Sequence, residues 1–334
     1  MNCRFFRLVL FAVCLLAFPF QSPAPLVFRP GEGWTYEPYG GEGRWQRLSA
    51  KEQLAVAQAA FDQKAYSLAL KAARYLILKW PTADYAPQAQ YLMARSYEAT
   101  GKAEKAFKEY QKLLEKQPKF ADFDEIRQRQ YEIANRYLAG KRFMRWGFIP
   151  YRSMDRTAGM YGDIVKTGPH SQVAPQAQLK IGTAQEKQKV LCFKSPDYPA
   201  AVKAYDLAAD RYYDQPKVAS EAIFRAGLAY RQQALAADRD QTTAGHAIAK
   251  FTDFMALYPD DSRAPEAQRI IASLKSEQAR GNFAVARFYE KRHRWDSARI
   301  YYNEVLLQDP NSPYATEARQ RIDQLKQRIL GTGK

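Results

Sequence analysis

Hydrophobic and small residues recur every three or four positions along most of the chain from residue 49 onward, which is the period of an amphipathic α-helix. Residues 87–118 and 283–310 each indicate two helices in which small and aromatic residues lie one turn apart and a proline ends the pair. Small residues let two helices cross closely, and large residues fill the space beside the crossing. The predicted packing positions are Ala94, Tyr97, Ala106, Tyr110 and Pro118 in the first pair and Ala286, Tyr289, Ala298, Tyr302 and Pro310 in the second.

A short connector recurs between these helix pairs. The segments "PTADYAPQAQ", "PHSQVAPQAQ", "PDDSRAPEAQ" and "PNSPYATEAR" begin at residues 81, 169, 259 and 310, and each places alanine five and eight residues after its first proline. Two degenerate copies begin at Pro118 and Pro216. A connector repeated in this way is typical of a solenoid. We therefore expect an all-α fold, a tetratricopeptide-repeat superhelix of about six helix hairpins over residues 49–330 with a C-terminal capping helix.

Three of the predicted turns between paired helices are long, at residues 140–152, 189–199 and 235–245. In a solenoid such turns share one edge of the molecule, so insertions there enlarge a single surface. The first insert holds Arg142, Arg145 and Trp146, and Arg and Trp are residue types that anchor interfaces. Two interpretations stay open: these residues contact a partner, or Trp146 and Phe148 fold back onto the neighbouring helix.

The turn before residue 296 is the second candidate surface. Arg292 and Arg294 lie between two predicted helices, where the chain must be solvated, and Trp295 opens the second helix. Trp295 therefore either packs against its own repeat or lies exposed. Together with the first insert, this turn gives six candidate partner-binding residues.

The N-terminus has the features of an export signal. Arg4 and Arg7 precede an apolar run that ends at Pro19 and is short for a membrane span. Residues 1–24 are expected to be a cleaved signal peptide or an uncleaved anchor. Residues 25–48, rich in Gly, Pro and aromatic residues, are expected to be a linker, and Cys192 is the one cysteine expected in the mature chain.

Charge and residue chemistry narrow the function. The chain carries 51 Lys and Arg against 35 Asp and Glu, a net charge of +16; without Arg4 and Arg7 the balance is 49 against 35, or +14. Such a surface attracts anions, and the export signal favours envelope anions over nucleic acid. His170, His246 and His293 are expected in connectors or turns and lack the spacing of a metal site, and no phosphate loop or nucleophile motif occurs. We expect no enzyme, no cofactor and no metal.

The stretch "YPDDSRAPEAQ" followed by "GNFAVARFYEKRHRWDSARIYYNEVLLQDPNSPYATEAR" resembles the outer-membrane assembly lipoproteins of the BamD (YfiO) family. The phrase beginning "LAVAQAAFDQKAYSLALKAARYLILKW" resembles the opening of the same family. The resemblance implies a periplasmic repeat scaffold that binds the barrel-insertion protein BamA, largely through its C-terminal repeats, and receives unfolded β-barrel proteins. One feature departs from the family: Cys14 follows Val13 inside the apolar run and lacks the small preceding residue of a lipid-attachment signal.

The expected function is therefore a non-enzymatic scaffold at the periplasmic face of the outer membrane. Its expected partners are a BamA-like barrel-assembly protein and unfolded outer-membrane proteins. The alternatives are a cell-envelope coordinator of the Tol-Pal or polysaccharide-export kind and a binder of anionic cell-wall or lipopolysaccharide polymer.

Overall fold

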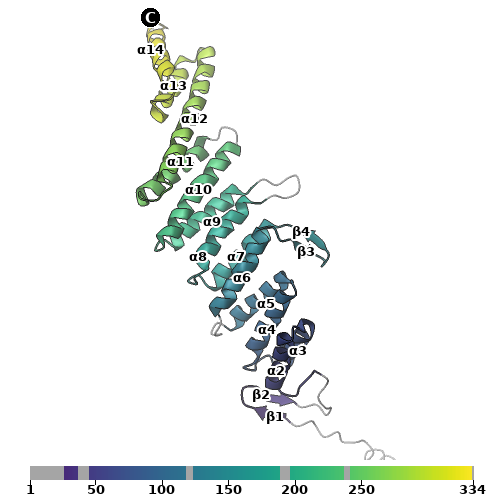
Figure 1. Cartoon of the computed structure of the whole chain (residues 1–334). Helices are drawn as coiled ribbons and strands as arrows, with labels where there is room; N and C mark the ends of the chain where they lie inside the picture. The colour runs from purple at the N-terminus through teal and green to yellow at the C-terminus, as the bar shows by residue number, and fades with distance from the viewer. Residues whose placement is uncertain (1–25, 37–44, 118–122, 189–195, 237–240, 333–334) are drawn as a thin grey trace, which may run out of the picture. The chain divides into compact units, whose positions relative to one another are not determined.

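The structure, a computed structural model, describes residues 26–36, 45–117, 123–188, 196–236 and 241–332 (Figure 1). The predicted signal at 1–24, Pro118 and Cys192 lie outside these residues. The chain divides into two compact units, residues 1–121 and 122–334. Each unit is described by itself below.

Among its described residues, the first unit contains two short strands and four helices. Ser49 caps the first helix by accepting a hydrogen bond from the Glu52 amide, which satisfies one of the free donors of that helix end. The two strands pair antiparallel, and the helices follow one another as two hairpins (Figure 1). The elements are β1 (Leu26–Arg29), β2 (Gly33–Tyr36), α2 (Ala50–Asp62), α3 (Tyr66–Lys79), α4 (Ala86–Ala99) and α5 (Ala103–Lys116).

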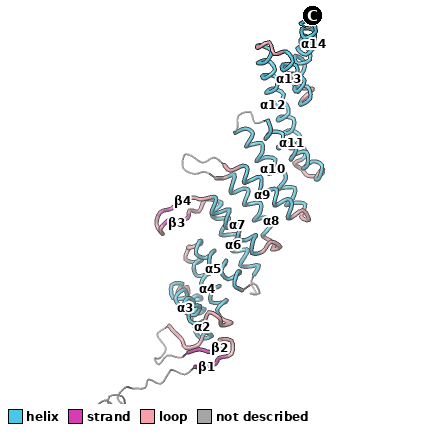
Figure 2. The backbone as a smooth tube through the Cα atoms, turned by 180° about the vertical axis from the view of Figure 1, so that it is seen from behind, coloured by secondary structure: helices cyan, strands magenta, loops and turns pink. Residues whose placement is uncertain are grey.

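The second unit contains nine helices among its described residues and one further strand pair (Figure 2). The strands β3 (Phe143–Arg145) and β4 (Ile149–Tyr151) lie between α6 and α7. The helices are α6 (Phe123–Leu138), α7 (Met154–Thr167), α8 (Ala174–Glu186), α9 (Tyr198–Arg211), α10 (Pro216–Ala236), α11 (Gln241–Leu257), α12 (Ala264–Lys291), α13 (Trp295–Gln308) and α14 (Ala315–Thr332).

Within each unit a helix packs on the helices before and after it in the chain. The pairs α2/α3, α4/α5, α6/α7, α8/α9, α10/α11 and α12/α13 are the six expected hairpins, and α14 is the expected capping helix. The all-α, tetratricopeptide-like fold predicted from the sequence is thus confirmed. Among the described residues, no helix combines the length and apolar character that crossing a membrane requires.

Small residues lie at the helix crossings, as the sequence predicts. Ala94, Ala106, Ala286 and Ala298 are fully buried. In the longer hairpins the small residue is glycine: a Cβ added at Gly182 would lie 2.5 Å from the Tyr205 ring, and one at Gly227 would lie 2.9 Å from the Phe251 ring. At each of these crossings the backbone of the glycine packs directly against one aromatic ring. The close approach of the two helices therefore depends on that glycine and that aromatic residue together.

In each of the four full connectors, the next helix starts at the same distance from the first proline. The alanine five residues after each proline begins a helix, and the alanine eight residues after it is fully buried. In all four, the amide of that first alanine donates to a carbonyl three residues earlier, closing a tight turn. The first-alanine and buried-alanine pairs are Ala86 and Ala89, Ala174 and Ala177, Ala264 and Ala267, and Ala315 and Ala318.

Two segments differ from their predicted form. Part of the expected linker at 25–48 forms the β1–β2 hairpin, which is held to its unit by a hydrogen bond from the Asp84 amide to the Gly31 carbonyl, 2.8 Å long. The third insert is wrong in its bounds: α10 continues to Ala236 and α11 begins at Gln241, so His246 lies inside a helix and not in a turn. Helical periodicity continues into both ends of that insert, and only residues 237–240 lie outside the described helices.

Candidate partner-binding surfaces

The first insert folds as a β-hairpin that projects from the helices of the second unit (Figures 1 and 2). Its turn places Trp146 at φ 53° and Gly147 at φ 86°, and the Phe148 amide donates to the Arg145 carbonyl over 3.3 Å. Two successive residues with positive φ match the turn twist that antiparallel strands favour. Phe143 anchors the base: it is 2% exposed and its ring stacks on Tyr137 at 4.2 Å.

The outer part of this hairpin carries large apolar side chains into solvent. The hairpin tip, residues 144–149, includes Met144, Trp146, Phe148 and Ile149, which are 54%, 73%, 70% and 40% exposed. The alternative in which Trp146 and Phe148 fold back onto a helix is therefore wrong; Phe143 makes that contact instead. Arg145 lies over the Trp146 ring at 4.8 Å.

The second candidate turn is less open than the first. Trp295 opens α13 and is half-buried: His293 meets its ring edge-on at 5.0 Å, and Arg328 of α14 lies over it at 5.3 Å. Arg292 is exposed but lies over the ring of Phe288 at 4.3 Å. Arg294 is exposed. Trp295 thus packs partly, against its own turn and the capping helix α14, and the arginines are the accessible part of this turn.

The structure therefore divides the six predicted residues between two turns. Arg142, Arg145 and Trp146 lie in the α6–α7 turn, and Arg292, Arg294 and Trp295 lie in the α12–α13 turn. Four complete helices, α8 to α11, separate the two hairpins in the chain. Each turn is a separate candidate surface.

A groove between the first helices α8 and α10 was not predicted residue by residue. It encloses about 230 Å³ and is lined by Gln176, Leu179, Lys180, Thr183, Lys217, Glu221 and Arg225. Since α8 and α10 also contact each other directly, the groove runs along two neighbouring repeats.

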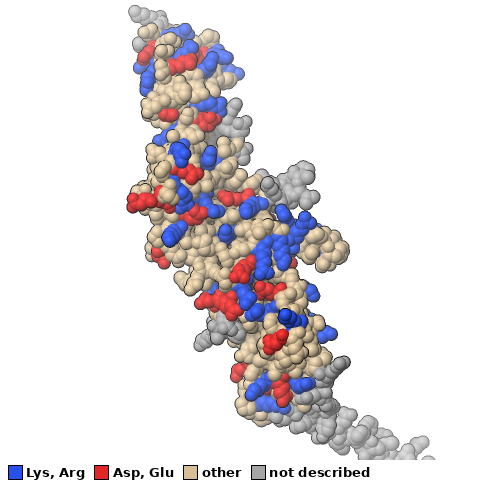
Figure 3. All heavy atoms as spheres, in the orientation of Figure 1, with Lys and Arg blue, Asp and Glu red and all other residues tan. Residues whose placement is uncertain are grey.

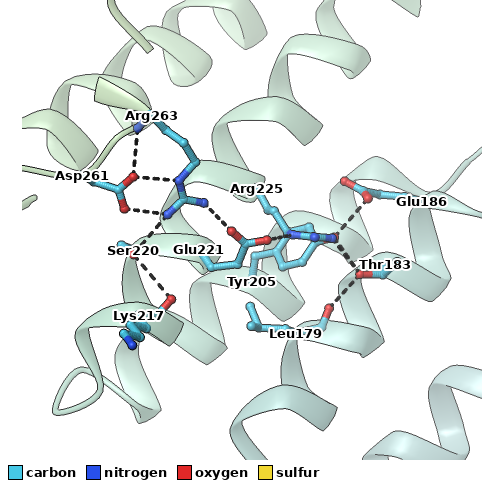
Figure 4. A network of polar contacts seen from close by, with 10 residues as sticks. All are labelled: Leu179, Thr183, Glu186, Tyr205, Lys217, Ser220, Glu221, Arg225, Asp261 and Arg263. Carbon is cyan, nitrogen blue, oxygen red and sulfur yellow. Dashed lines mark hydrogen bonds and ion pairs between the residues drawn. The ribbon is translucent and has the colours of Figure 1, made fainter. Parts of the chain in front are cut away.

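A chain of polar contacts forms the wall of this groove and continues into the α11–α12 connector (Figure 4). Arg225 pairs with Glu221 and donates to the Thr183 hydroxyl over 3.1 Å. Arg263 of the connector pairs with the same Glu221 and, at 2.7 Å, with Asp261. The sequence signals were the i, i+4 spacing of Glu221 and Arg225 and the acidic–basic "DDSR" connector. The network ties three successive repeats together.

Lys180 gives the groove a positive site. Burial lowers the pKa of Lys180 from its ordinary value, and the neighbouring Arg225 and Lys187 lower it further, against an opposing effect of Glu221. Among the described residues Lys180 makes no ion pair. A carboxylate placed beside this ammonium would offset its desolvation, so the groove favours an anionic group.

A larger hollow of about 640 Å³ lies on the second-helix side, among α9, α10 and α11. Asp206 on its wall pairs with Lys250 at 2.9 Å, and Tyr230 contacts His246 with ring centroids 5.5 Å apart. These contacts hold neighbouring repeats together. No group of three or more His, Cys, Asp and Glu side chains suited to a metal ion occurs in the described part of the chain.

The helix hairpins, repeated connectors and small–aromatic crossings define a tetratricopeptide-repeat protein. A tetratricopeptide-repeat family model matches residues 88–119. The model of YfiO, described as an outer membrane lipoprotein family, matches residues 162–309. The chain thus contains a region that matches the YfiO family, which confirms the resemblance drawn from the C-terminal stretch; the opening phrase, which begins at residue 54, lies outside this match.

Among solved structures, the C-terminal part of a repeat protein from Cytophaga hutchinsonii is 14% identical, with 81% of this chain and 87% of that chain covered and a TM-score of 0.34. A tetratricopeptide repeat protein from Parabacteroides merdae is 12% identical, with 83% and 99% covered and a TM-score of 0.30. A thermophilic repeat protein from Thermus thermophilus is 14% identical, with 68% and 98% covered and a TM-score of 0.28. No curated protein matches the sequence significantly.

Proposed function

We propose that this protein is a non-enzymatic scaffold of the cell envelope that holds protein segments during the assembly of outer-membrane β-barrel proteins. The observation that carries the proposal is the match of residues 162–309 to the YfiO outer membrane lipoprotein family. That region contains the whole α8–α10 groove and the α12–α13 turn. The predicted export signal supports a periplasmic location.

The groove suggests how a segment is held. An extended chain lies along α8 and α10, its backbone groups meet the polar wall of Thr183, Glu221 and Arg225, and an acidic side chain or terminal carboxylate pairs with Lys180. The α12–α13 turn, with exposed Arg292 and Arg294, is the proposed docking site for a BamA-like protein. Capture and docking thus use different repeats of one scaffold.

Photocrosslinking in native envelopes tests this function. A photoreactive amino acid replaces Gln176 in the groove or Arg292 in the turn, and adducts are identified by mass spectrometry. We expect unfolded barrel proteins at Gln176 and a BamA-like protein at Arg292. The control position is Tyr213, a side chain 77% exposed on the α9–α10 turn. Adducts at the two sites that match those at Tyr213, or that contain only polysaccharide or other envelope coordinators, would rule out the barrel-assembly role.

Lys180 gives a pH-dependent prediction. Because its pKa is lowered by burial and neighbouring cations, its charge is lost at a lower pH than that of an ordinary lysine. Binding of the segment recovered at Gln176, resynthesised as a labelled peptide, should weaken roughly tenfold in Lys180→Gln at neutral pH, the scale of one charge-assisted hydrogen bond. Wild-type binding should fall as pH rises through the lowered pKa. The control Lys203→Gln, at an exposed position on α9, should bind and titrate as the wild type does.

A further inference from the structure

The β3–β4 hairpin combines an apolar tip with a basic base. The tip side chains Met144, Trp146, Phe148 and Ile149 are at least 40% exposed, while Phe143 fixes the base to the helix pair below. Both ribbon views show the hairpin projecting away from the helices (Figures 1 and 2). The apolar surface is therefore presented on a protrusion, where a flat or yielding surface can reach all of it at once.

The charge around the tip has one sign. Residues 140–153 contain Lys141, Arg142, Arg145 and Arg152 and no acidic residue. On the face drawn in Figure 3, basic side chains gather at the base of the projection, and the surface of its outer part is mostly uncharged. The hairpin thus presents apolar side chains flanked by cations, and it is complementary to a surface that is anionic outside and apolar just beneath.

We infer that the β3–β4 hairpin inserts its tip into the surface of an anionic lipid bilayer. Trp and other large apolar side chains favour the boundary between headgroups and acyl chains, and arginines beside them pair with lipid phosphates. Arg145, which lies over the Trp146 ring, would reach the lipid phosphates while the Trp146 ring enters the boundary between headgroups and acyl chains. This site goes beyond the proposed protein capture and does not depend on it.

A β-strand partner fits the hairpin less well than a bilayer does. Strand addition needs a free edge with regular N–H donors, and β4 carries Pro150, which has no N–H, opposite Met144. A protein pocket would have to accept four large side chains spread along a turn. A bilayer needs no such matched shape, because lipids move aside.

Photolabelling from the lipid phase tests the inference on the full chain. Vesicles of phosphatidylcholine, with or without phosphatidylglycerol, carry a photoactivatable lipid, and labelled peptides are mapped by mass spectrometry. We expect residues 144–149 to be labelled in phosphatidylglycerol vesicles and about tenfold less in pure phosphatidylcholine. Because the readout is local to the hairpin, attachment of any other segment to the vesicles does not count in its favour.

Two variants of the hairpin separate the contribution of its cations from that of its apolar tip. Arg142→Ser with Arg145→Ser should reduce labelling of 144–149 about tenfold in phosphatidylglycerol vesicles, and Trp146→Asn with Phe148→Ser should abolish it; Asn tolerates the positive φ of position 146. The charge-matched control is Lys71→Ser with Lys116→Ser, and the aromatic control is Tyr213→Ser, all at exposed positions. Circular dichroism checks that each variant is folded.

The result that overturns the inference is equally local. Labelling of 144–149 no stronger than that of the Tyr213 turn, or unchanged by both hairpin variants, would show that the tip does not enter lipid. A different outcome would assign the hairpin to a protein partner instead. In that outcome the wild type shows no lipid labelling, and a protein that is crosslinked to the wild type in envelopes is no longer crosslinked to the Trp146→Asn, Phe148→Ser variant. Neither outcome bears on crosslinking at Gln176, so the two proposals fail separately.

Discussion

At the scale of single residues, buried tyrosine hydroxyls bind the two helices of a hairpin to each other. Tyr110 donates to Glu98 over 3.0 Å and Tyr302 donates to Glu290 over 2.7 Å, each from the second helix to the first. In the α10/α11 hairpin, Phe251 replaces the tyrosine. The residue one turn after the crossing glycine Gly227 is Arg231, which replaces the glutamate. Acceptor and hydroxyl are thus lost together, as expected if an unpaired buried polar group is costly.

The same contact shapes the titration of the tyrosines. Tyr205 donates to Glu186 over 3.0 Å, and burial together with the nearby Glu186 charge raises the pKa of Tyr205 to about 12. Burial also raises the pKa of Glu186, since the carboxylate is withdrawn from water. Both shifts disfavour the charged forms of these side chains. The Tyr205 hydroxyl therefore stays neutral and donates its hydrogen bond within the packed crossing.

Glycine at a crossing makes a prediction at this scale. Gly182→Ala places a Cβ 2.5 Å from the Tyr205 ring, so we expect the free energy of unfolding to fall by about 1–3 kcal/mol. Gly159→Ala lies in the middle of α7 with open space around its Cβ and should raise that free energy by about 0.5–1 kcal/mol. Urea denaturation followed by circular dichroism measures both. A gain in both variants would mean that the crossing tolerates a larger residue.

At the scale of elements, the connectors fix where each new helix starts. The α11–α12 connector does so with charge: Asp261 accepts from the Arg263 amide at 3.0 Å and from its guanidinium at 2.9 and 2.7 Å. These bonds lower the pKa of Asp261 from 3.8 to about 2. Arg263 in turn lies over the Phe224 ring at 4.9 Å, so the turn is packed as well as paired.

This turn predicts a pH-dependent stability. A carboxyl group with a lowered pKa stabilises the folded state above its unfolded pKa, and that contribution is lost as pH falls toward the folded pKa. Asp261→Asn should therefore cost about 1 kcal/mol near neutral pH, with the difference from wild type shrinking as pH approaches about 2. Asp260→Asn, at the exposed neighbouring position, should cost little at any pH. Thermal melts across the acid range measure both; a pH-independent Asp261 difference would count against the pairing.

The sequence predicts elements best where two signals coincide. Helical period and connector prolines together located the hairpins, because repetition makes each copy confirm the others. The β3–β4 hairpin could not be read from its few residues, since Arg, Trp and Phe there fit a loop equally well. The α8–α10 groove depends on which of many surface residues two helices bring together, and Lys180 has no local mark that distinguishes it from other lysines. Arrangement in space, and not composition, defines both surfaces.

At the scale of the whole molecule, stability is distributed along the repeats of each unit. In the second unit each helix contacts mainly the helices adjacent in sequence, with α8 and α10 as the main next-nearest contact among the described helices. Arrays of this kind have stabilities that approximate a sum of repeat and interface contributions. A defect in one hairpin should therefore spread to its neighbours and fade with distance along the array.

The last hairpin offers a sharp case, because α13 lies between α12 and the capping helix α14 and its crossing residue Ala298 is fully buried. Ala298→Leu forces three extra carbons into this crossing, so we expect a local loss of about 1–3 kcal/mol. Native-state hydrogen exchange should show reduced protection in α13, α14 and the second half of α12, while α8, α9 and α10 keep theirs. Ala284→Leu, on the exposed face of α12, adds the same carbons without overpacking and should leave all of these helices protected. Equal loss of protection throughout the unit would instead show that the second unit unfolds as one cooperative body.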